Sequence, residues 1–422
     1  MRLLRGGLCA LIGFAVLAHG GVEEWARAVL ETGVALLFLI WALRFYFNDQ
    51  EQPAFSPVLP PLALFFLVGL GQWFFRTTAS SYNTRIELML LTATLLFLFL
   101  CVQVFQTLQD WRIFVWFGMG FGFLVSVFGI LQHLTFNGKL YWVRELTYGA
   151  IPFGPYVNRN HFAGLMELLI PLALVPLILG KVRRERLAVV TLFAVMPIAA
   201  LFLSASRGGI LSFCAQFALL AFLILRRRGV TKHLLAVSAV LLTALIIVTW
   251  LGVGRILQRF SSMQALEVTA GKRGAMRKGA WHMLLDHPVA GTGLGTFQIA
   301  YPPYETLYDG KVVNHTHNDY LEALAETGAL GGLCCAWFLA VLLLKSLSLF
   351  RQRDFSFPGT LQLAGIVACA GFLVHALFDF NFHIPSNLWL FFLMAHLGTT
   401  EIQQSSSMPP VRRHRDTSRN RD

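Results

Sequence analysis

Charge is scarce in this 422-residue chain, in which 13% of the residues are charged and 56% are hydrophobic. A water-soluble domain carries roughly 25% charged residues. Half that amount, with a mean hydropathy of +0.62, excludes an ordinary soluble protein. The apolar excess includes 37 Phe and 10 Trp, which suits lipid-facing helices and the aromatic belts at membrane surfaces. We therefore expect an integral membrane protein.

Cysteines with the spacing of a metal or redox motif are also absent. The six cysteines all lie inside apolar runs, and no Cys-x-x-Cys motif occurs. Cysteines in such surroundings behave as small hydrophobic residues. The sequence therefore predicts neither a disulfide framework nor a cysteine-based zinc site.

Long apolar runs dominate what is present. A membrane-spanning helix needs about 20 mostly apolar residues. Such runs predict an all-α polytopic membrane protein with about 12 transmembrane helices, in a transmembrane domain over 1–400. The candidate spans are 7–22, 27–47, 57–75, 86–107, 112–133, 161–180, 187–204, 207–226, 233–253, 320–349, 360–378 and 385–400. The first resembles a signal-peptide core but lacks a small-residue cleavage site, so we expect a retained helix.

The net charge of +12 has a topological explanation, because Lys and Arg accumulate in cytoplasmic loops of membrane proteins. With the N-terminus inside, the basic clusters at 181–186, 226–232 and 345–353 all fall inside. The polar tail, 401–422, also falls inside and is predicted to be disordered. This interpretation removes the need for a nucleic-acid partner. The segment 254–319 then faces outward, is long enough to form a small subdomain, and is unusually basic for an outer loop. An anionic ligand is the simplest reason for that charge.

Arg207 is the first candidate for binding an anion. It lies in the motif SASRGG at 204–209, at the predicted outer mouth of two helices. A charge at the end of a membrane helix is costly unless it reaches head groups, forms a pair or binds a ligand. The two glycines let a ligand or another backbone approach closely, and a guanidinium fork suits phosphate. The alternative is that Arg207 only reaches lipid head groups.

Two more arginines lie in the long outer segment. Arg273, Arg277 and Trp281 are spaced four residues apart, so a helix would place them on one face. The two guanidiniums would repel each other unless an anion lies between them. The alternative is a solvated basic face. The three glycines that follow, within 286–297, predict a tight turn, because no strand precedes them as in a dinucleotide-binding fold.

The motif NHTHNDYLE at 314–322 stands where this segment enters the next helix. A neutral histidine can take a proton from a sugar hydroxyl, and His317 is the candidate base, with His315 and Asn318 beside it. Capping of the helix is one alternative. A metal site is another, although this spacing is not a standard zinc pattern.

Polar residues also stand at the outer ends of two other helices. Asn160 and His161 open the helix at 161–180 and can either cap it or bind sugar hydroxyls. Asp379 follows His375 and can orient a histidine, pair with an arginine or form a plain structural salt bridge. Under the topology derived from charge, all these groups fall on one side of the membrane. We therefore expect a single outward-facing site.

Four motifs together resemble the O-antigen ligase-like (Wzy_C) superfamily over roughly 156–400. They are NRNHFAGLMELLIPL, SASRGG, RKGAWHMLLDHPVAGTGLGTF and HTHNDYLEALAETGALGGL. The resemblance implies a C-type glycosyltransferase fold in the bacterial inner membrane and a reaction at the periplasmic face. It implies transfer of a glycan from undecaprenyl pyrophosphate to a hydroxyl of a glycan, lipid A-core or other acceptor. The transfer would invert the anomeric centre and need neither metal nor cofactor.

The resemblance also implies roles for individual residues. By motif, Arg207 matches the arginine of the SR turn, and Arg277 matches the loop arginine four residues before a tryptophan. Both would hold the pyrophosphate. His317 matches the histidine before the Asn-x-Tyr-Leu run and would act as base, and Asp379 resembles the late acidic residue. Arg273 is an additional arginine.

Several functions remain open at this point. Some polymerases of the superfamily carry an outer-loop arginine followed eleven positions later by glycine. Here position 218 is Ala and position 288 is Pro, which favours a ligase slightly. A transporter of lipid-linked glycans would place ionisable groups near mid-membrane, where His375 is the main example. A non-catalytic scaffold of an envelope-assembly complex is the third possibility.

Overall fold

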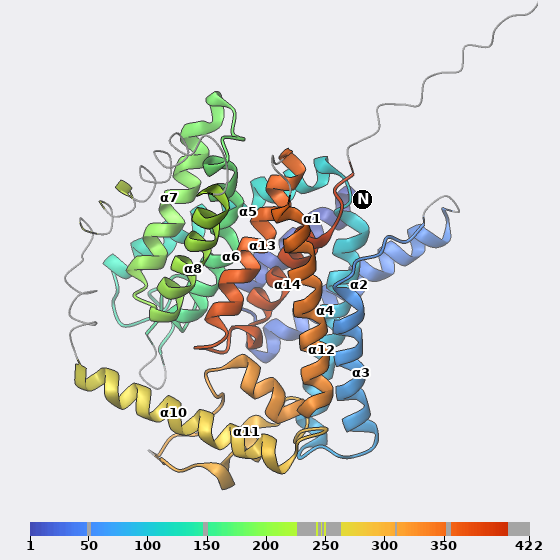
Figure 1. Ribbon diagram of the computed structural model, residues 1–422, viewed down its shortest axis with the longest axis vertical. Coiled ribbons are helices and arrows are strands. Elements are labelled where there is room, and N and C mark those ends of the chain that lie inside the picture. The colour runs from blue at the N-terminus through green and yellow to red at the C-terminus, as the bar shows by residue number, and fades with distance from the viewer. Residues whose placement is uncertain are drawn as a thin grey trace, which may run out of the picture.

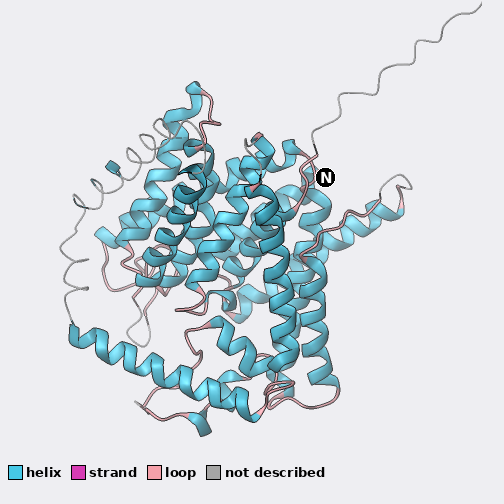
Figure 2. Cartoon of the chain, in the orientation of Figure 1, coloured by secondary structure: helices cyan, strands magenta, loops and turns pink. Residues whose placement is uncertain are grey.

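The computed structural model describes residues 1–48, 52–146, 151–225, 242–243, 246, 249, 263–308, 310–351 and 356–403. Within these ranges the regular secondary structure is entirely helical (Figure 2). The α-helices are α1 (Arg2–Leu17), α2 (Glu24–Tyr46), α3 (Leu59–Phe74), α4 (Ser81–Val104), α5 (Leu108–Leu134), α6 (Arg159–Ile178), α7 (Leu187–Leu203), α8 (Arg207–Leu225), α10 (Met263–Asp286), α11 (Phe297–Ala300), α12 (Asp319–Phe350), α13 (Phe357–His375) and α14 (Pro385–Thr399). Short 3-10 helices are η1 (Arg184–Arg186), η2 (Pro302–Tyr304) and η3 (Asn381–His383).

The apolar runs of the sequence become these helices. Among the described residues, seven helices are long and apolar enough to cross a membrane, and α3 and α8 are shorter apolar helices. Every predicted span except 233–253 coincides with a helix, and most of that segment lies outside the described residues. The chain is thus a multi-pass membrane protein. The total of 12 spans stays a prediction.

Helix α6 forms the centre of the bundle. Its residues are buried continuously from His161 to Ile178. It packs against α13 and α7, and α13 also packs against α14 and α8 (Figure 1). Because α6 has 20 residues, it is about 30 Å long, close to the thickness of a bilayer core. The beginning of α6 and the end of α13 meet at one end of the bundle, and the opposite ends of both helices line a separate cavity.

Polar side chains define where several of these helices begin. Asn158 caps α6, Asn318 caps α12 and Ser356 caps α13, and Thr107 forms a capping box with Asp110 at the start of α5. Such caps satisfy amide groups that the first helical turn leaves without partners. The caps of α6 and α12 both lie at the end of the bundle that carries the predicted site.

The described part of the predicted outer subdomain, 263–308 and 310–319, contains α10 and α11, and α10 crosses beneath the ends of the spanning helices in Figure 1. It contributes to a small apolar cluster of its own, formed by Ala280, Met283, Phe297, Tyr301 and, from α12, Ala325. Residues 254–262 and 404–422 lie outside the described ranges. The sidedness of the subdomain and the disorder of the tail therefore stay predictions.

The three-glycine segment is a tight structural turn, as its sequence predicts. Helix α12 is broken at Gly328, whose φ is +60°. The backbone amides of Thr292 and Gly293 donate to the carbonyls of Ala325 and Glu326 beside this break, at 3.0 and 2.9 Å. The loop thus satisfies backbone groups near the interrupted helix, which a membrane protein must do internally.

Candidate functional site

A histidine and an aspartate from distant parts of the chain meet at one end of the bundle. His317 lies just before the cap of α12, with φ at +53°, and Asp379 follows α13. Nδ1 of His317 lies 3.1 Å from Oδ1 of Asp379. The sequence left open whether Asp379 orients a histidine, and the structure brings these two side chains into contact.

Asp379 is buried and held from several sides. Its Oδ2 accepts a hydrogen bond from the amide of Asn160 and lies 4.0 Å from Nη2 of Arg273. Its Oδ1 also accepts from the backbone amide of Phe380 at 3.0 Å. Burial by itself raises the pKa of Asp379, but the hydrogen bond from His317 and the attraction of nearby histidines outweigh it and hold the pKa well below its usual range.

The charged carboxylate fixes the role of each nitrogen in His317. A carboxylate only accepts hydrogen bonds, so the proton of a neutral imidazole belongs on Nδ1, facing Asp379. The other nitrogen, Nε2, then keeps its lone pair. A histidine in this tautomer can accept a proton from a substrate.

Two arginines of α10 reach the same segment. Arg273 donates from Nη1 to the carbonyl of Phe378 at 2.9 Å. Arg277 donates from Nη2 to the carbonyls of Leu377 and His317, at 3.2 and 3.4 Å. Burial and, next, repulsion from Arg273 lower the pKa of Arg277. The two guanidiniums therefore share one face of α10, as predicted, and their repulsion favours an anion between them.

Trp281 lies one turn further along α10 and is half exposed, at 50%. Its place on the helix agrees with the predicted spacing from Arg273 and Arg277. An exposed aromatic ring beside two arginines can pack against a sugar, and its role in binding remains a proposal.

Arg207 begins α8 and is half buried. The turn before it places Ala205 at a φ of +51°, and the hydroxyl of Ser206 accepts from the amide of Gly209 at 3.2 Å. A Cβ at Gly208 would lie 2.6 Å from the ring of His375, so glycine lets α8 approach α13. His375 is one turn before Asp379. Arg207 therefore lies at the same end of the bundle as the pair of His317 and Asp379, which we call the dyad.

The predicted polar ligands Asn160, His161 and Asn318 all lie at this end. Asn160 binds Asp379, and the buried ring of His161 meets Phe380 edge-on at 4.8 Å between centroids. The side-chain oxygen of Asn318 caps α12, and its amide donates to Leu377 at 3.3 Å. Both amides thus already have protein partners, which favours positioning roles for them.

A second cluster of histidines and carboxylates lies beside the dyad. Nδ1 of His315 is 2.6 Å from Oε1 of Glu322, and Nε2 of His383 is 3.3 Å from the same oxygen. Nδ1 of His383 is 3.1 Å from Oδ1 of Asp319. The ring of Phe380 stacks on His315 at 4.3 Å. The motif at 314–322 placed Asp319 and Glu322 near His315, but the sequence did not point to His383.

This cluster includes the described group that best suits a metal ion. His315, Glu322 and His383 offer ligand atoms that lie within 4.8 Å of one another. Burial lowers the pKa of His383, but attraction to Glu322 and the hydrogen bond with Asp319 raise it to about 10. A metal ligand must be a neutral histidine, so the hydrogen-bonded imidazolium competes with metal binding. Metal-independent chemistry stays a prediction.

A further buried pair joins α6 to α13. Nδ1 of His375 lies 2.8 Å from Oε1 of Glu167, and both side chains are almost fully buried. Gln216 of α8 donates to the carbonyls of Glu167 and Val367, at 2.8 and 3.1 Å. Glu167 was not among the predicted site residues, although an acid inside an apolar run was a signal for it. This network holds α6, α8 and α13 together next to the dyad.

Comparison with known families gives one match. The family model described as O-antigen ligase, Wzy_C, matches residues 168–336. The matched stretch includes Arg207, Arg277 and His317, whereas Asp379 lies beyond it. No curated protein gives a significant match. Over residues 168–336 the chain is therefore similar to the O-antigen ligase family.

Proposed function

We propose that this protein transfers a glycan from undecaprenyl pyrophosphate to a hydroxyl of an acceptor, as an O-antigen ligase-like glycosyltransferase. The observation that carries the proposal is the His317–Asp379 contact of 3.1 Å, with Arg273 and Arg277 bonded to the backbone around it. One end of the bundle thereby combines a base for a hydroxyl with cations for a pyrophosphate.

The reaction follows from this arrangement. Nε2 of His317 takes the proton of the acceptor hydroxyl as the oxygen attacks the anomeric carbon. The bond from that carbon to the pyrophosphate oxygen breaks, and the pyrophosphate leaves with the bonding electrons. Arg207 and Arg277 stabilise the charge that develops on the leaving group. Attack from the side opposite the leaving group inverts the anomeric centre.

Asp379 and Arg273 act through their neighbours. Asp379 holds the proton of His317 on Nδ1, and Arg273 supports both Asp379 and the carbonyl of Phe378. Asn160 fixes the second oxygen of the carboxylate. We assign these three as positioning residues, and His161, His315 and Trp281 as candidates for contact with sugar.

The basic segment 181–186 and the His317 site lie at opposite ends of α6, which indicates their sidedness. Because basic loops stay in the cytoplasm, the site faces the periplasm if the membrane is the bacterial inner membrane. Cysteines introduced at Lys278 and Arg184, in a chain without its own cysteines, test this. A membrane-impermeant reagent should label the first in intact spheroplasts and the second only after permeabilisation. The reverse pattern rejects the assignment.

The test of the function itself is a purified reaction with an undecaprenyl-pyrophosphate-linked glycan. Candidate acceptors are lipid A-core and a second lipid-linked glycan, and mass spectrometry identifies the product. Transfer to lipid A-core establishes a ligase, whereas chain extension establishes a polymerase. Transbilayer movement of an unchanged donor, without any transfer, supports a transporter and rejects the proposal.

A further inference from the structure

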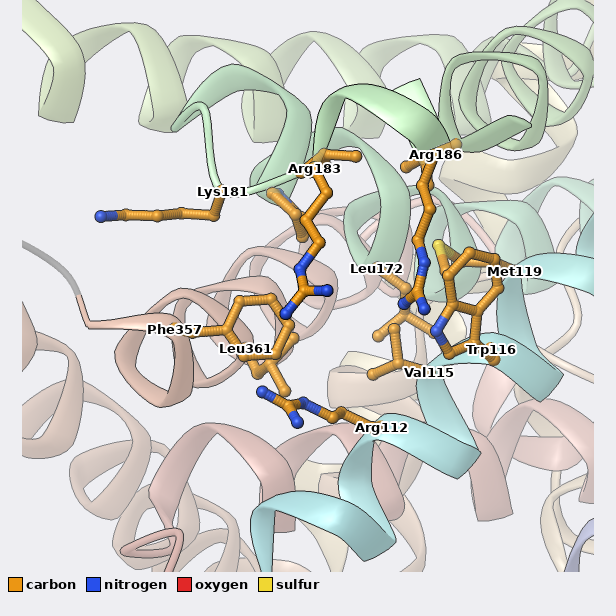
Figure 3. A pocket seen from close by; sticks show the side chains of 13 residues that line it. Arg112, Val115, Trp116, Met119, Leu172, Lys181, Arg183, Arg186, Phe357 and Leu361 are labelled. Atoms are coloured by element: carbon orange, nitrogen blue, oxygen red, sulfur yellow. The ribbon is translucent and has the colours of Figure 1, made fainter. Parts of the chain in front are cut away.

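A cavity of about 380 Å³ lies at the end of α6 and α13 that is remote from His317 (Figure 3). It is formed by α5, α6, α7, α13 and the segment between α6 and α7. The proposed transfer reaction does not use it. The residues that line it are Arg112, Val115, Trp116, Met119, Leu172, Pro176, Lys181, Val182, Arg183, Arg186, Val190, Phe357 and Leu361.

The cavity combines a basic rim with an apolar floor. Its charged lining residues are all cations, namely Arg112, Lys181, Arg183 and Arg186. Buried side chains such as Leu172 form the floor. Such a combination is amphipathic in the same sense as a lipid, which has a charged head and an apolar chain.

The arginines are held over aromatic rings at the edge of the cavity. The guanidinium carbon of Arg112 lies 5.2 Å from the ring centre of Phe357, and that of Arg186 lies 5.4 Å from the ring centre of Trp116. In Figure 3 the guanidinium groups of Arg112 and Arg183 point toward a common space beside Phe357, while Lys181 extends away from it. Two guanidiniums from separate elements thus converge on one place.

Within the described part of the chain, none of these four cations forms an ion pair. Glu185, the acidic residue of the 181–186 segment, is exposed and forms no ion pair with them there either. Converging guanidiniums repel each other, and an anion between them removes that cost. Arginine also binds phosphate oxygens through two parallel hydrogen bonds.

We propose that this cavity binds an anionic phospholipid, with the phosphate of the head group between Arg112 and Arg183 and an acyl chain on the apolar floor. A lipid is favoured over a free phosphate because the floor belongs to membrane-spanning helices. Basic pockets between such helices on the cytoplasmic side are suited to anionic head groups. This inference does not rest on the proposed transferase activity.

The test compares lipids on the intact protein by native mass spectrometry. Purified protein in detergent is titrated separately with phosphatidylglycerol and with phosphatidylcholine of the same acyl chains. Phosphatidylglycerol should bind at least tenfold more tightly, because it carries a net negative charge and phosphatidylcholine does not. Equal retention of both lipids by the wild-type protein overturns the proposal without any variant.

Two matched variants locate the site. Arg183→Gln should weaken phosphatidylglycerol binding about fivefold, and adding Arg112→Gln should weaken it about fivefold again. Arg184→Gln removes the same charge from the adjacent position, which does not line the cavity, and should have little effect. Equal losses in Arg183→Gln and Arg184→Gln would show general attraction to basic surface charge and contradict a defined site.

A third measurement distinguishes a lipid head group from a soluble phosphate as the bound anion. Glycerol phosphate and inorganic phosphate should fail to displace phosphatidylglycerol at millimolar concentrations, because neither covers the apolar floor. Displacement of the lipid by either anion at millimolar concentrations would show that the site binds a soluble anion, and the proposal would be wrong.

Discussion

Nδ1 of His317 lies 3.1 Å from Oδ1 of Asp379, although 62 positions separate the two residues in sequence. His317 precedes α12 and Asp379 follows α13, so their contact depends on how the two helices pack. Since the carboxylate is also held by Asn160 and by the amide of Phe380, it orients His317 and is itself fixed.

Replacing Asp379 with asparagine tests this orientation. The amide keeps the shape but loses the charge, so it no longer favours the tautomer with the proton on Nδ1. We expect turnover to fall by about 10² or more, within the range of general base catalysis, while donor affinity changes little. Turnover and donor binding should be measured together. Asp286→Asn, at an exposed position on α10, is the control and should behave like wild type.

Arg277→Lys keeps the positive charge but removes the planar guanidinium, whose Nη2 donates to the carbonyls of His317 and Leu377. We expect a loss of about 10²–10³ in rate, as for one lost contact to a developing anion. The neighbouring exposed residue is neutralised in Lys278→Gln, which should cost little. If Arg277→Lys is fully active, charge alone is sufficient and the geometric role of Arg277 is wrong.

The stability of the protein should depend on pH through His383. Its pKa is raised from 6.5 to about 10 by Glu322 and Asp319, against the effect of burial. The protonated form therefore stabilises the fold below pH 6.5, and this contribution is lost as pH rises toward 10. The melting temperature of wild type should exceed that of His383→Gln most at pH 6 and least near pH 10. A constant difference would contradict the assignment, and His287→Gln is the exposed control.

Gly291→Ala should destabilise the protein because the loop is packed against α12. Gly291 has a φ of +70°, and a Cβ there would lie 2.2 Å from the backbone of Glu326. We expect a cost of at least about 1–2 kcal/mol from the backbone conformation alone. Gly274 of α10 has open space around it, so Gly274→Ala should be neutral or slightly stabilising. Thermal unfolding in detergent distinguishes the two variants.

Transfer should survive chelation of metal ions. The arginines supply positive charge at the site, and Glu322 and Asp319 raise the pKa of His383, which disfavours the neutral imidazole that a metal requires. Activity after treatment with EDTA should equal that of untreated protein. Loss of activity that a divalent ion restores would favour a metal at His315, Glu322 and His383.

The sequence predicted the helices better than their contacts. An apolar run is a property of the local sequence, so hydropathy located each described spanning helix. The four-residue spacing of Arg273 and Arg277 likewise predicted that they share one face of a helix. The cluster around Phe380 was missed, because His315 and His383 come from segments that only the tertiary fold brings together. Spacing along the sequence could not reveal that His383, in η3, lies beside His315 and Glu322 as a third potential metal ligand. The basic cavity was missed for the same reason, since Arg112 and Phe357 lie on different helices.

The most direct test of the central claim is to measure donor affinity and turnover separately in His317→Ala. The variant must first be shown to be folded by its elution profile. If His317 is the base for the acceptor hydroxyl, turnover should fall by about 10²–10⁴, while affinity for the undecaprenyl-pyrophosphate-linked donor stays close to that of wild type. Wild-type turnover in His317→Ala, or a loss of donor affinity as large as the loss in Arg207→Ala, would contradict this assignment.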